Sequence, residues 1–466
     1  MNANLKKELR SAAARLASAA MLCCSVAACS TYQAKPLASA STLLDAIPRL
    51  TVDAASLHFP ERTSHGFDPS DGLDMTELSM LAVTNNPDLK AARNDAGVAH
   101  AQAFATGLLP DPQLALSHDL SNTGGPGATK AFSYGLSFDF GSLLTRPSTS
   151  AAAEFEAKKT DLNLLWQEWQ VIAQAQLLYI KMVQGQKTMD VLQQSLALFS
   201  DRLLRTQTAL SRGLLTSDAV TPDLVAFQDV KRQLNDMERQ ANQNRHDLHL
   251  LLGIQSNVDI KLQDGPMPPA LDERRILAAL GNLRQRRPDL MALEAGYSAQ
   301  DQRYRAALLA QFPSLNIGLT RARDSSDVYS NAVGLTLSLP ILNRNRGNIA
   351  VEQATRQKLY DDYQQRLNIA DSDVHKILAD QRINAGQLAD TRMGIESLSL
   401  AVRRTEIAHL ANNVDSLAYA NVAGALLAKQ IEEINLQQSI LEQRVALQAL
   451  LGGELPVLNP DKSEKR

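Results

Sequence analysis

The sequence has almost no cysteine, few aromatic residues and little net charge. All three cysteines lie in the first 29 of the 466 residues. The rest of the chain therefore has no thiol for a disulfide, a nucleophile or a metal site. Aromatic residues make up only 5% of the chain, and the formal net charge of -3 gives no reason to expect a nucleic-acid partner.

The sequence also lacks long apolar runs and enzymatic motifs. No segment after the N-terminus contains 18 uninterrupted apolar residues, so we predict no transmembrane helix in the mature chain. There is no G-x-S-x-G, no H-E-x-x-H and no phosphate-binding loop, and "TGGPG" at 123 to 127 belongs to a turn between two strands. We therefore expect no catalytic residues and no enzyme.

Eight histidines raise the question of a metal site. His246 and His249 are three residues apart on one helix face, and "DSDVH" brings Asp371 and His375 close together. Structural zinc usually needs four ligands, and pairs at such spacings are common by chance. We therefore expect ordinary helix-surface residues here and no metal site.

The N-terminus has the features of an export signal. A basic segment, residues 1–15, precedes an apolar segment that is too short to span a bilayer. The sequence Val26-Ala27-Ala28-Cys29 resembles the bacterial lipobox, in which the cysteine is lipidated and becomes the mature N-terminus. An ordinary signal with a nearby Ala-x-Ala site is the alternative. We expect a lipoprotein signal peptide at 1–28, a covalent lipid such as palmitate on Cys29, and no other cofactor.

The body of the chain is a tandem duplication. "NNPDLKAARNDAG" at 85 aligns with "RRPDLMALEAGYS" at 286, and "LLGIQ" at 251 aligns with "LLGGE" at 450. We predict a tether at 29–72, a first repeat at 73–253, a proline-rich linker at 254–271, a second repeat at 272–454 and a polar tail at 455–466. Each repeat is expected to contain a helix, two strands that form a hairpin, a long helix, a turn and a final helix.

Four segments alternate with period two: about 112–120, 131–140, 313–322 and 331–340. Small polar residues fill one face, and the other face is apolar, with Phe132, Tyr134, Leu136, Phe138, Leu335 and Leu337. Strands of ~9 to 11 residues with two unlike faces suit a membrane β-barrel, and the six apolar residues would then face lipid. Four strands cannot close a barrel, so several protomers must contribute. A small soluble sheet under the helices is the alternative.

The helices after the hairpins are unusually long. No proline occurs between Pro147 and Pro222 or between Pro340 and Pro456. A helix from about 148 to 212 would extend ~100 Å, and its heptad spacing indicates side-by-side packing with other helices. Gly213 is expected to end it, with Thr221 and Pro222 as the N-cap and first residue of the next helix.

These motifs together resemble the TolC family of outer-membrane efflux proteins. The resemblance rests on the duplicated "PDL", the strand pairs, "VGLTLSLPILNRNRGNIA" at 333 to 350 and the closing "LLG", over residues 73–454. "PDPQL" and "LPILNRNRG" are similar to the heavy-metal exporter branch, the CzcC/CusC-like proteins. The resemblance implies a mainly α fold with membrane β, in which a homotrimer forms a 12-stranded β-barrel continued by a 12-helix tunnel across the periplasm.

The resemblance also implies a function and partners. It implies a passive efflux conduit that receives substrates, heavy-metal cations among them, from an inner-membrane RND-type transporter through a periplasmic membrane-fusion adaptor. The adaptor would dock at the helical tips around Gly213, Leu214 and Asn412. In TolC-like proteins an acidic constriction closes this end, and the candidates here are Asp218, Asp223, Asp415 and Leu417. The two TolC gate aspartates fall on Leu417 and Ala420, so a leucine ring is an equal candidate.

Two alternatives remain open at this stage. The tip aspartates could simply cap helices. The whole chain could be a coiled-coil structural lipoprotein that is tethered at the outer membrane and carries the strands as a small cap. Trimers that resist heat in detergent would favour the conduit, because a scaffold needs no closed barrel.

Overall fold

The structure is a computed structural model, and it describes residues 32–50, 67–119, 129–263, 265, 267–268, 272–411, 413–414 and 416–451. The predicted signal peptide, Cys29, Asn412 and Asp415 lie outside the described residues. The chain divides into two compact units, Met1–Leu43 and Leu44–Arg466. The described part of the first unit, residues 32–43, contains no helix or strand. The features below belong to the second unit.

The second unit contains two copies of one series of elements. The first copy consists of α2 (Met75–Asn85), α3 (Pro87–Gly107), β1 (Gln113–Asp119), β2 (Ala131–Asp139), α4 (Gly141–Ser211) and α5 (Ser217–Leu252). The second consists of α6 (Glu273–Leu280), α7 (Leu283–Arg286), α8 (Pro288–Leu309), β3 (Ser314–Arg323), β4 (Tyr329–Ser338), α9 (Arg346–Leu410) and α10 (Ser416–Leu451). The predicted fold, mainly helical with paired strands in a duplicated unit, is confirmed.

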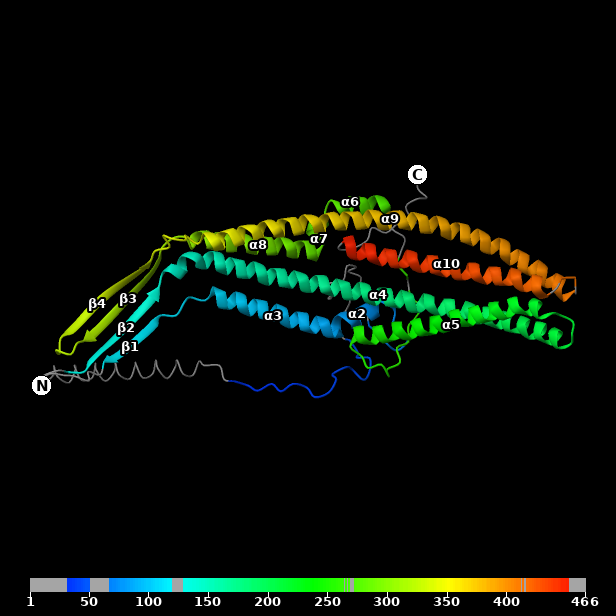
Figure 1. Cartoon of the computed structure of the whole chain (residues 1–466), viewed down its shortest axis with the longest axis horizontal. Helices are drawn as coiled ribbons and strands as arrows, with labels where there is room; N and C mark the ends of the chain where they lie inside the picture. The colour runs from blue at the N-terminus through cyan, green and yellow to red at the C-terminus, as the bar shows by residue number, and fades with distance from the viewer. Residues whose placement is uncertain are drawn as a thin grey trace. The chain divides into compact units, whose positions relative to one another are not determined.

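The strands and the helical turns lie at opposite ends of this unit. Figure 1 shows the four strands at one end, while the turns from α4 to α5 and from α9 to α10 lie together at the other end. The helices α4 and α9 contain 71 and 65 residues, which corresponds to about 100 Å each at ~1.5 Å per residue.

The start of α4 differs from the prediction. It begins at Gly141, directly after β2, rather than at about 148, and Pro147 lies inside it. The side chain of Asp139 accepts a hydrogen bond from the Gly141 N–H at 2.9 Å. This hydrogen bond satisfies one of the backbone N–H groups that have no partner at the start of a helix. Pro147 lies in the second turn, where it removes only one backbone hydrogen bond. Strand and helix are therefore joined without a loop.

The start of α5 also differs. The prediction that Thr221 and Pro222 begin this helix is wrong, because α5 begins at Ser217 and contains Pro222. Thr216 is in the extended conformation at the N-cap position, and Asp218 places a negative charge in the first turn, where it stabilises the helix dipole. The Thr221 hydroxyl donates to the carbonyl of Ser217 at 3.0 Å, one turn back within the helix.

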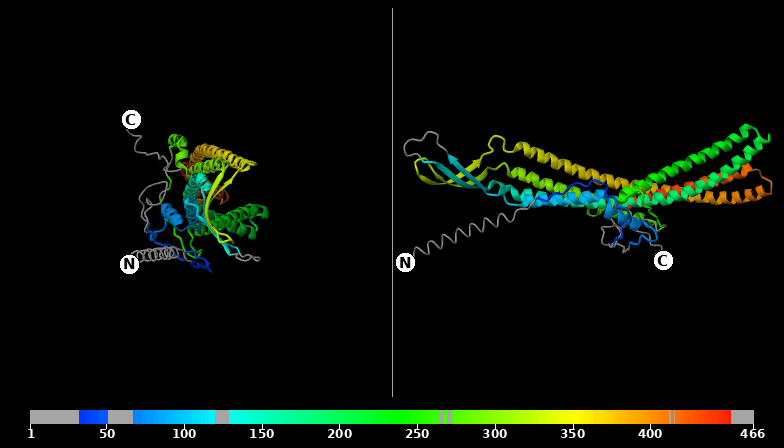
Figure 2. Two further views of the ribbon diagram at one scale, coloured as in Figure 1. Left: turned by 90° about the vertical axis from the view of Figure 1, so that its left-hand side faces the viewer. Right: turned by 90° about the horizontal axis from the view of Figure 1, so that it is seen from below.

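Two apolar cores lie in the middle of the helical part. One joins α2, α4 and α5 to residues of α10 and includes Tyr179 and Leu252. The other joins α6, α8 and α9 to the end of α10 and includes Ile276 and Val374. Figure 2 shows that toward the helical turns α4 continues beside α5, and α9 continues beside α10. The first core therefore fixes the two repeats to each other, whereas the second core lies within the second repeat.

The four strands form a single antiparallel sheet of order β1-β2-β3-β4. The central pair, β2 and β3, comes from different repeats, with Leu136 opposite Leu319. Within the described residues, β1 and β4 pair with only one strand each. The sheet therefore has two open edges.

Candidate functional site

One face of the sheet is apolar on all four strands. The strand registers place Leu114, Leu136, Leu319 and Val333 in one row, and Phe138, Ile317 and Leu335 in the next. Several of these side chains are largely exposed, with 76% for Val333 and 67% for Leu335. The predicted set of Phe132, Tyr134, Leu136, Phe138, Leu335 and Leu337 lies on this face. An exposed apolar surface of this extent is typical of contact with lipid or protein.

The opposite face of the sheet carries small and polar side chains. One row consists of Ala115, Gly135, Thr320 and Ala332, and another consists of Gln113, Ser137, Gly318 and Gly334. Because successive residues of a strand point to opposite faces, the two surfaces are separated by the thickness of one sheet. The sheet can therefore separate an apolar from an aqueous environment.

The helix α9 presents a second exposed apolar surface. Only Ala370, Val374, Leu378 and Thr391 of its 65 residues are fully buried. The exposed apolar residues Met393, Leu400 and Ile407 follow one another at intervals of seven. A heptad stripe of this kind is the packing surface of a helix against another helix.

The tip between α4 and α5 is a tight turn that depends on a glycine. Gly213 has a positive φ of +73°, a conformation that glycine adopts at helix C-termini without strain. The N–H groups of Gly213 and Leu214 donate to the carbonyls of Leu210 and Ala209, each at 2.9 Å. Leu214 projects into solvent with 72% of its surface exposed. The turn therefore presents an apolar side chain to solvent at the end of the helical hairpin.

The predicted gate residues divide into two kinds. Asp218 in α5 and Leu417 in α10 are exposed at the same end of the molecule. Asp223, in contrast, is buried: its carboxylate forms an ion pair with Arg202 of α4. Asp218 and Leu417 therefore remain candidates to line a constriction, whereas Asp223 contributes to packing inside the protomer.

The Asp223 ion pair links three helices near the tips. Arg202 of α4 pairs with Asp223 of α5 and also donates from Nη1 to Oδ1 of Asn421 in α10, at 3.0 Å. Nearby, a Cβ added at Gly424 of α10 would lie 2.9 Å from the ring of Phe199 in α4. The glycine therefore allows α10 to approach α4 closely. The two helical hairpins are fixed to each other at this level by polar and apolar contacts together.

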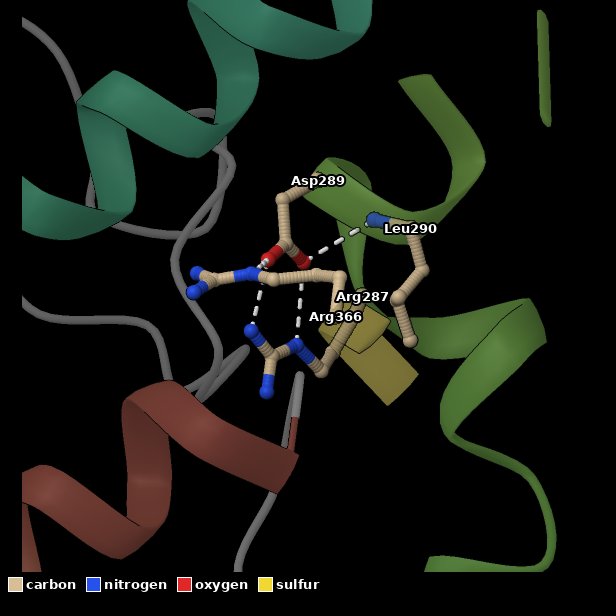
Figure 3. Close-up of polar contacts among 4 residues, drawn as sticks. All are labelled: Arg287, Asp289, Leu290 and Arg366. Carbon is tan, nitrogen blue, oxygen red and sulfur yellow. Dashed lines mark hydrogen bonds and ion pairs between the residues drawn. The ribbon is translucent and has the colours of Figure 1, made fainter. Parts of the chain in front are cut away.

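A cluster of two arginines and an aspartate lies near the middle of the unit (Figure 3). Arg287 donates from Nε and Nη2 to the two carboxylate oxygens of Asp289, at 2.9 and 2.6 Å, and Arg366 of α9 donates from Nε to Asp289 at 2.7 Å. Both guanidinium groups lie over the ring of Trp166 in α4, at 5.2 and 5.8 Å. The cluster therefore joins α8, α9 and α4.

Burial and the neighbouring charges shift the pKa of Asp289 in opposite directions. Burial by itself raises the pKa of this carboxyl, but the hydrogen bonds and positive charges of Arg287 and Arg366 outweigh it and hold the pKa below its usual 3.8. Arg287 is almost fully buried, at 1% exposure. Asp289 therefore compensates a charge that the protein has removed from water.

The same position in the first repeat has different chemistry. Asn86 is the counterpart of Arg287 and is also buried. Its side chain accepts from the Leu89 N–H at 2.9 Å and donates to the carbonyl of Leu251 at 2.9 Å. The repeated "PDL" motif identified Asn86 and Arg287 as equivalent positions. It did not predict the ionic cluster around Asp289.

His246 and His375 are exposed as expected, but His249 differs from the expected helix-surface position. His249 is buried, and its two ring nitrogens lie 2.6 and 2.8 Å from the carbonyl oxygens of Arg245 and Val258. In the part of the chain that the structure describes, no three His, Cys, Asp or Glu side chains gather closely enough to hold a metal ion. None of the described helices is both long and apolar enough to cross a membrane.

Comparison with known proteins gives consistent matches. The family model named outer membrane efflux protein matches residues 279–453. The chain is 24% identical over 403 residues to the probable outer membrane lipoprotein SilC of Salmonella typhimurium, with 80% of this chain and 84% of that protein aligned. It is 25% identical over 405 residues to the cation efflux system protein CusC of Escherichia coli (strain K12), with 80% and 85% aligned.

Solved structures agree with the observed architecture. A crystal structure of CusC matches with a TM-score of 0.67 and 20% identity, covering 89% of this chain and 100% of that one. The outer-membrane channel OprN matches with a TM-score of 0.69 and 16% identity, covering 91% and 99%. At these identities the structures establish the fold. The hairpin strands and the long helical hairpins of this chain therefore correspond to those of known outer-membrane channels.

Proposed function

Since the chain is a TolC-like outer membrane efflux protein by its fold and by the sequence of its second repeat, we propose that it is the outer-membrane channel of an efflux system. The four strands are a part of a β-barrel in the outer membrane, and the helices continue the duct into the periplasm. The protein is a passive conduit and carries out no chemistry on its cargo.

The sheet is the observation that supports this proposal best. One face of all four strands is apolar and exposed, and the other is small and polar. A sheet with these two faces can have lipid on one side and water on the other. A small cap on a structural scaffold, the alternative, would bury its apolar face under helices.

Open sheet edges support a homotrimer. Unpaired backbone groups are too costly in lipid, so β1 and β4 must find strand partners in other copies. Three copies of four strands give a closed barrel of twelve, with β1 of one protomer paired to β4 of the next. The exposed stripe of α9 at Met393, Leu400 and Ile407 then packs against a helix of a neighbour.

Relatives suggest the cargo and the partners. CusC is named as a cation efflux protein, and on this basis we propose heavy-metal cations as the cargo. We further propose that an RND-type transporter in the inner membrane supplies the energy and that a periplasmic adaptor docks on the tip around Gly213 and Leu214. The exposed leucine of that turn offers the apolar contact for the adaptor.

Cys29 is proposed to carry a lipid that anchors the mature N-terminus in the outer membrane. The support is the basic segment, the short apolar segment and "VAAC" at 26 to 29. We expect Cys29→Ser to abolish labelling by a radioactive fatty acid while the barrel still forms a trimer. Cys24→Ser is the matched control and should label like wild type. Persistent labelling of Cys29→Ser would contradict the proposal.

Channel recordings test both the conduit and its gate. The purified protein in planar lipid bilayers should give discrete conductance steps, whereas a structural scaffold should give none. We expect Asp218→Ala combined with Leu417→Ala to raise the single-channel conductance by about twofold or more, because both exposed side chains lie at the tips and would narrow the duct.

Asp236 of α5, which is half-buried and pairs with Arg232, provides a control for the gate. Asp236→Ala removes a carboxylate from the same helix away from the tip and should leave the conductance unchanged. If the Asp218 and Leu417 variant keeps the wild-type conductance, the constriction is formed by other residues. Asp223 is not a suitable test, because its removal would leave Arg202 buried without its ion-pair partner.

A further inference from the structure

The apolar face of the sheet carries charged residues at the end where the turn joins β3 to β4. In β3 the residues on this face are Leu315, Ile317 and Leu319, followed at the same spacing by Arg321 and Arg323. All five point to the same side of the sheet, because side chains in a strand alternate. Two guanidinium groups therefore continue the apolar face, in rows that also hold His118 of β1 and Asn331 of β4.

Aromatic rings surround these arginines. The guanidinium carbons of Arg321 and Arg323 lie 5.9 and 5.7 Å from the centre of the Tyr329 ring. Phe132 of β2 meets Tyr329 edge to face at 6.4 Å, and Tyr134 stacks with Phe132 at 6.3 Å. Aromatic side chains of this kind are enriched where a membrane protein passes from lipid tails to head groups.

Of the two arginines, only Arg323 forms an ion pair with a nearby carboxylate among the described residues. Arg323 is paired with Asp327, with Nε 2.6 Å from Oδ1. The carboxylate of Asp324 accepts from the N–H groups of Ser326 and Val328 at 2.8 and 2.9 Å, within the β3–β4 turn. Arg321 is exposed and has no ion-pair partner among the residues that the structure describes. Within the described part of the chain, Arg321 therefore presents a guanidinium group without an ion-pair partner at this end of the apolar face.

The length of β3 places the arginines at a membrane surface. The strand has ten residues, and a membrane-spanning strand needs ~9 to 11. Arg321 and Arg323 occupy the last two positions on the lipid-facing side, at the end far from the helices (Figure 1). Charge is poorly tolerated at the midplane of the bilayer but is tolerated near the head groups.

We propose that Arg321, supported by Arg323 and Tyr329, binds phosphate groups of lipids in the outer leaflet of the membrane. This inference rests on the proposed function, in which this face contacts lipid. A guanidinium group forms two parallel hydrogen bonds to a phosphate, and its planar shape lets it stack on Tyr329 at the same time. Tyr134 lies directly opposite Arg321, and the next row of the same face, with Leu136 and Leu319, meets the acyl chains, which favours a lipid over free phosphate.

Lipid titration of the purified protein tests this site. Diphosphoryl lipid A in detergent is the probe, and the same lipid without its phosphates is the reference. We expect the wild-type trimer to bind the phosphorylated lipid at least tenfold more tightly. Arg321→Gln should weaken that binding by about tenfold, and Arg321→Lys should lie between, because lysine keeps the charge but loses the bidentate geometry.

Two control variants and one competitor complete the test. Thr320→Gln, one residue away on the polar face, and Arg232→Gln, exposed on α5, should bind like wild type. Inorganic phosphate at millimolar concentration should not displace the lipid, and displacement would contradict a lipid site. If Arg321→Gln binds lipid A as tightly as wild type, the inference is wrong.

The proposed function and this inference fail in different ways. A protein that elutes from size-exclusion chromatography as a monomer and gives no conductance would contradict the channel itself. A conducting trimer that binds phosphorylated and unphosphorylated lipid equally would contradict only the phosphate site.

Discussion

Leu335→Arg is expected to reduce the yield of outer-membrane trimer far below that of wild type. Leu335 lies on the apolar face, next to the row of Leu136, Leu319 and Val333 in the middle of the sheet. An arginine on the lipid face near the midplane costs ~2 to 4 kcal/mol, and three copies bring the cost to roughly 6 to 12 kcal/mol per assembly. This loss is comparable to the stability of a whole domain.

Thr336→Arg is the matched control for this variant. Thr336 is the next residue of β4 and points to the small polar face, opposite Asn316. Its arginine would enter water at little cost. The yields are compared by immunoblotting of outer-membrane extracts under conditions that preserve trimers. Equal yields for the two variants would refute the lipid-facing assignment of this strand.

Asp289→Asn is expected to destabilise the helical part by about 3 to 5 kcal/mol, because it leaves Arg287 buried without a compensating charge. The measurement is urea unfolding followed by far-ultraviolet circular dichroism. Glu294→Gln is the control, since it breaks the exposed ion pair with Arg284 and should cost about 1 kcal/mol or less. Equal unfolding midpoints for the two variants would show that the buried cluster stabilises the protein no more than the exposed ion pair does.

The same cluster gives a pH dependence of defined sign. The pKa of Asp289 is held below its ordinary 3.8 in the folded protein, since the two arginines outweigh the effect of burial. The stabilisation is therefore fully present above pH 3.8 and is lost as the pH falls through the folded pKa. Asp289→Asn should lose less stability than wild type over that acidic range.

Much of the architecture could be predicted because it depends on patterns that repeat along the chain. The period-two segments, the proline-free stretches and the duplicated "PDL" each reflect local geometry. Pairing within each hairpin was predicted, whereas the pairing of β2 with β3 across the two repeats came from the structure. The helix starts at Gly141 and Ser217 were missed because single side-chain contacts, such as Asp139 with the Gly141 N–H, decide where a helix begins.

The side-chain clusters could not be predicted in the same way. Arg202 and Asp223 are 21 positions apart on different helices, and the partner Asn421 comes from the other repeat. Nothing in the local pattern distinguishes Asp223 from the exposed Asp218, so both were predicted as gate residues. Arg321 and Arg323 were not singled out from the sequence, because the predicted strand ended at about 322 and the contact of both with Tyr329 depends on the register of β3 and β4.

The two open edges of the sheet have a genetic consequence. In the proposed trimer each copy accepts a strand from one neighbour and offers a strand to the other, so a single defective β1 or β4 would interrupt the whole ring. In a cell that makes normal and defective chains in equal amounts, only about one assembly in eight would contain three normal copies. Substitutions in the edge strands should therefore be dominant, whereas substitutions in the exposed helical surface away from these contacts should be recessive.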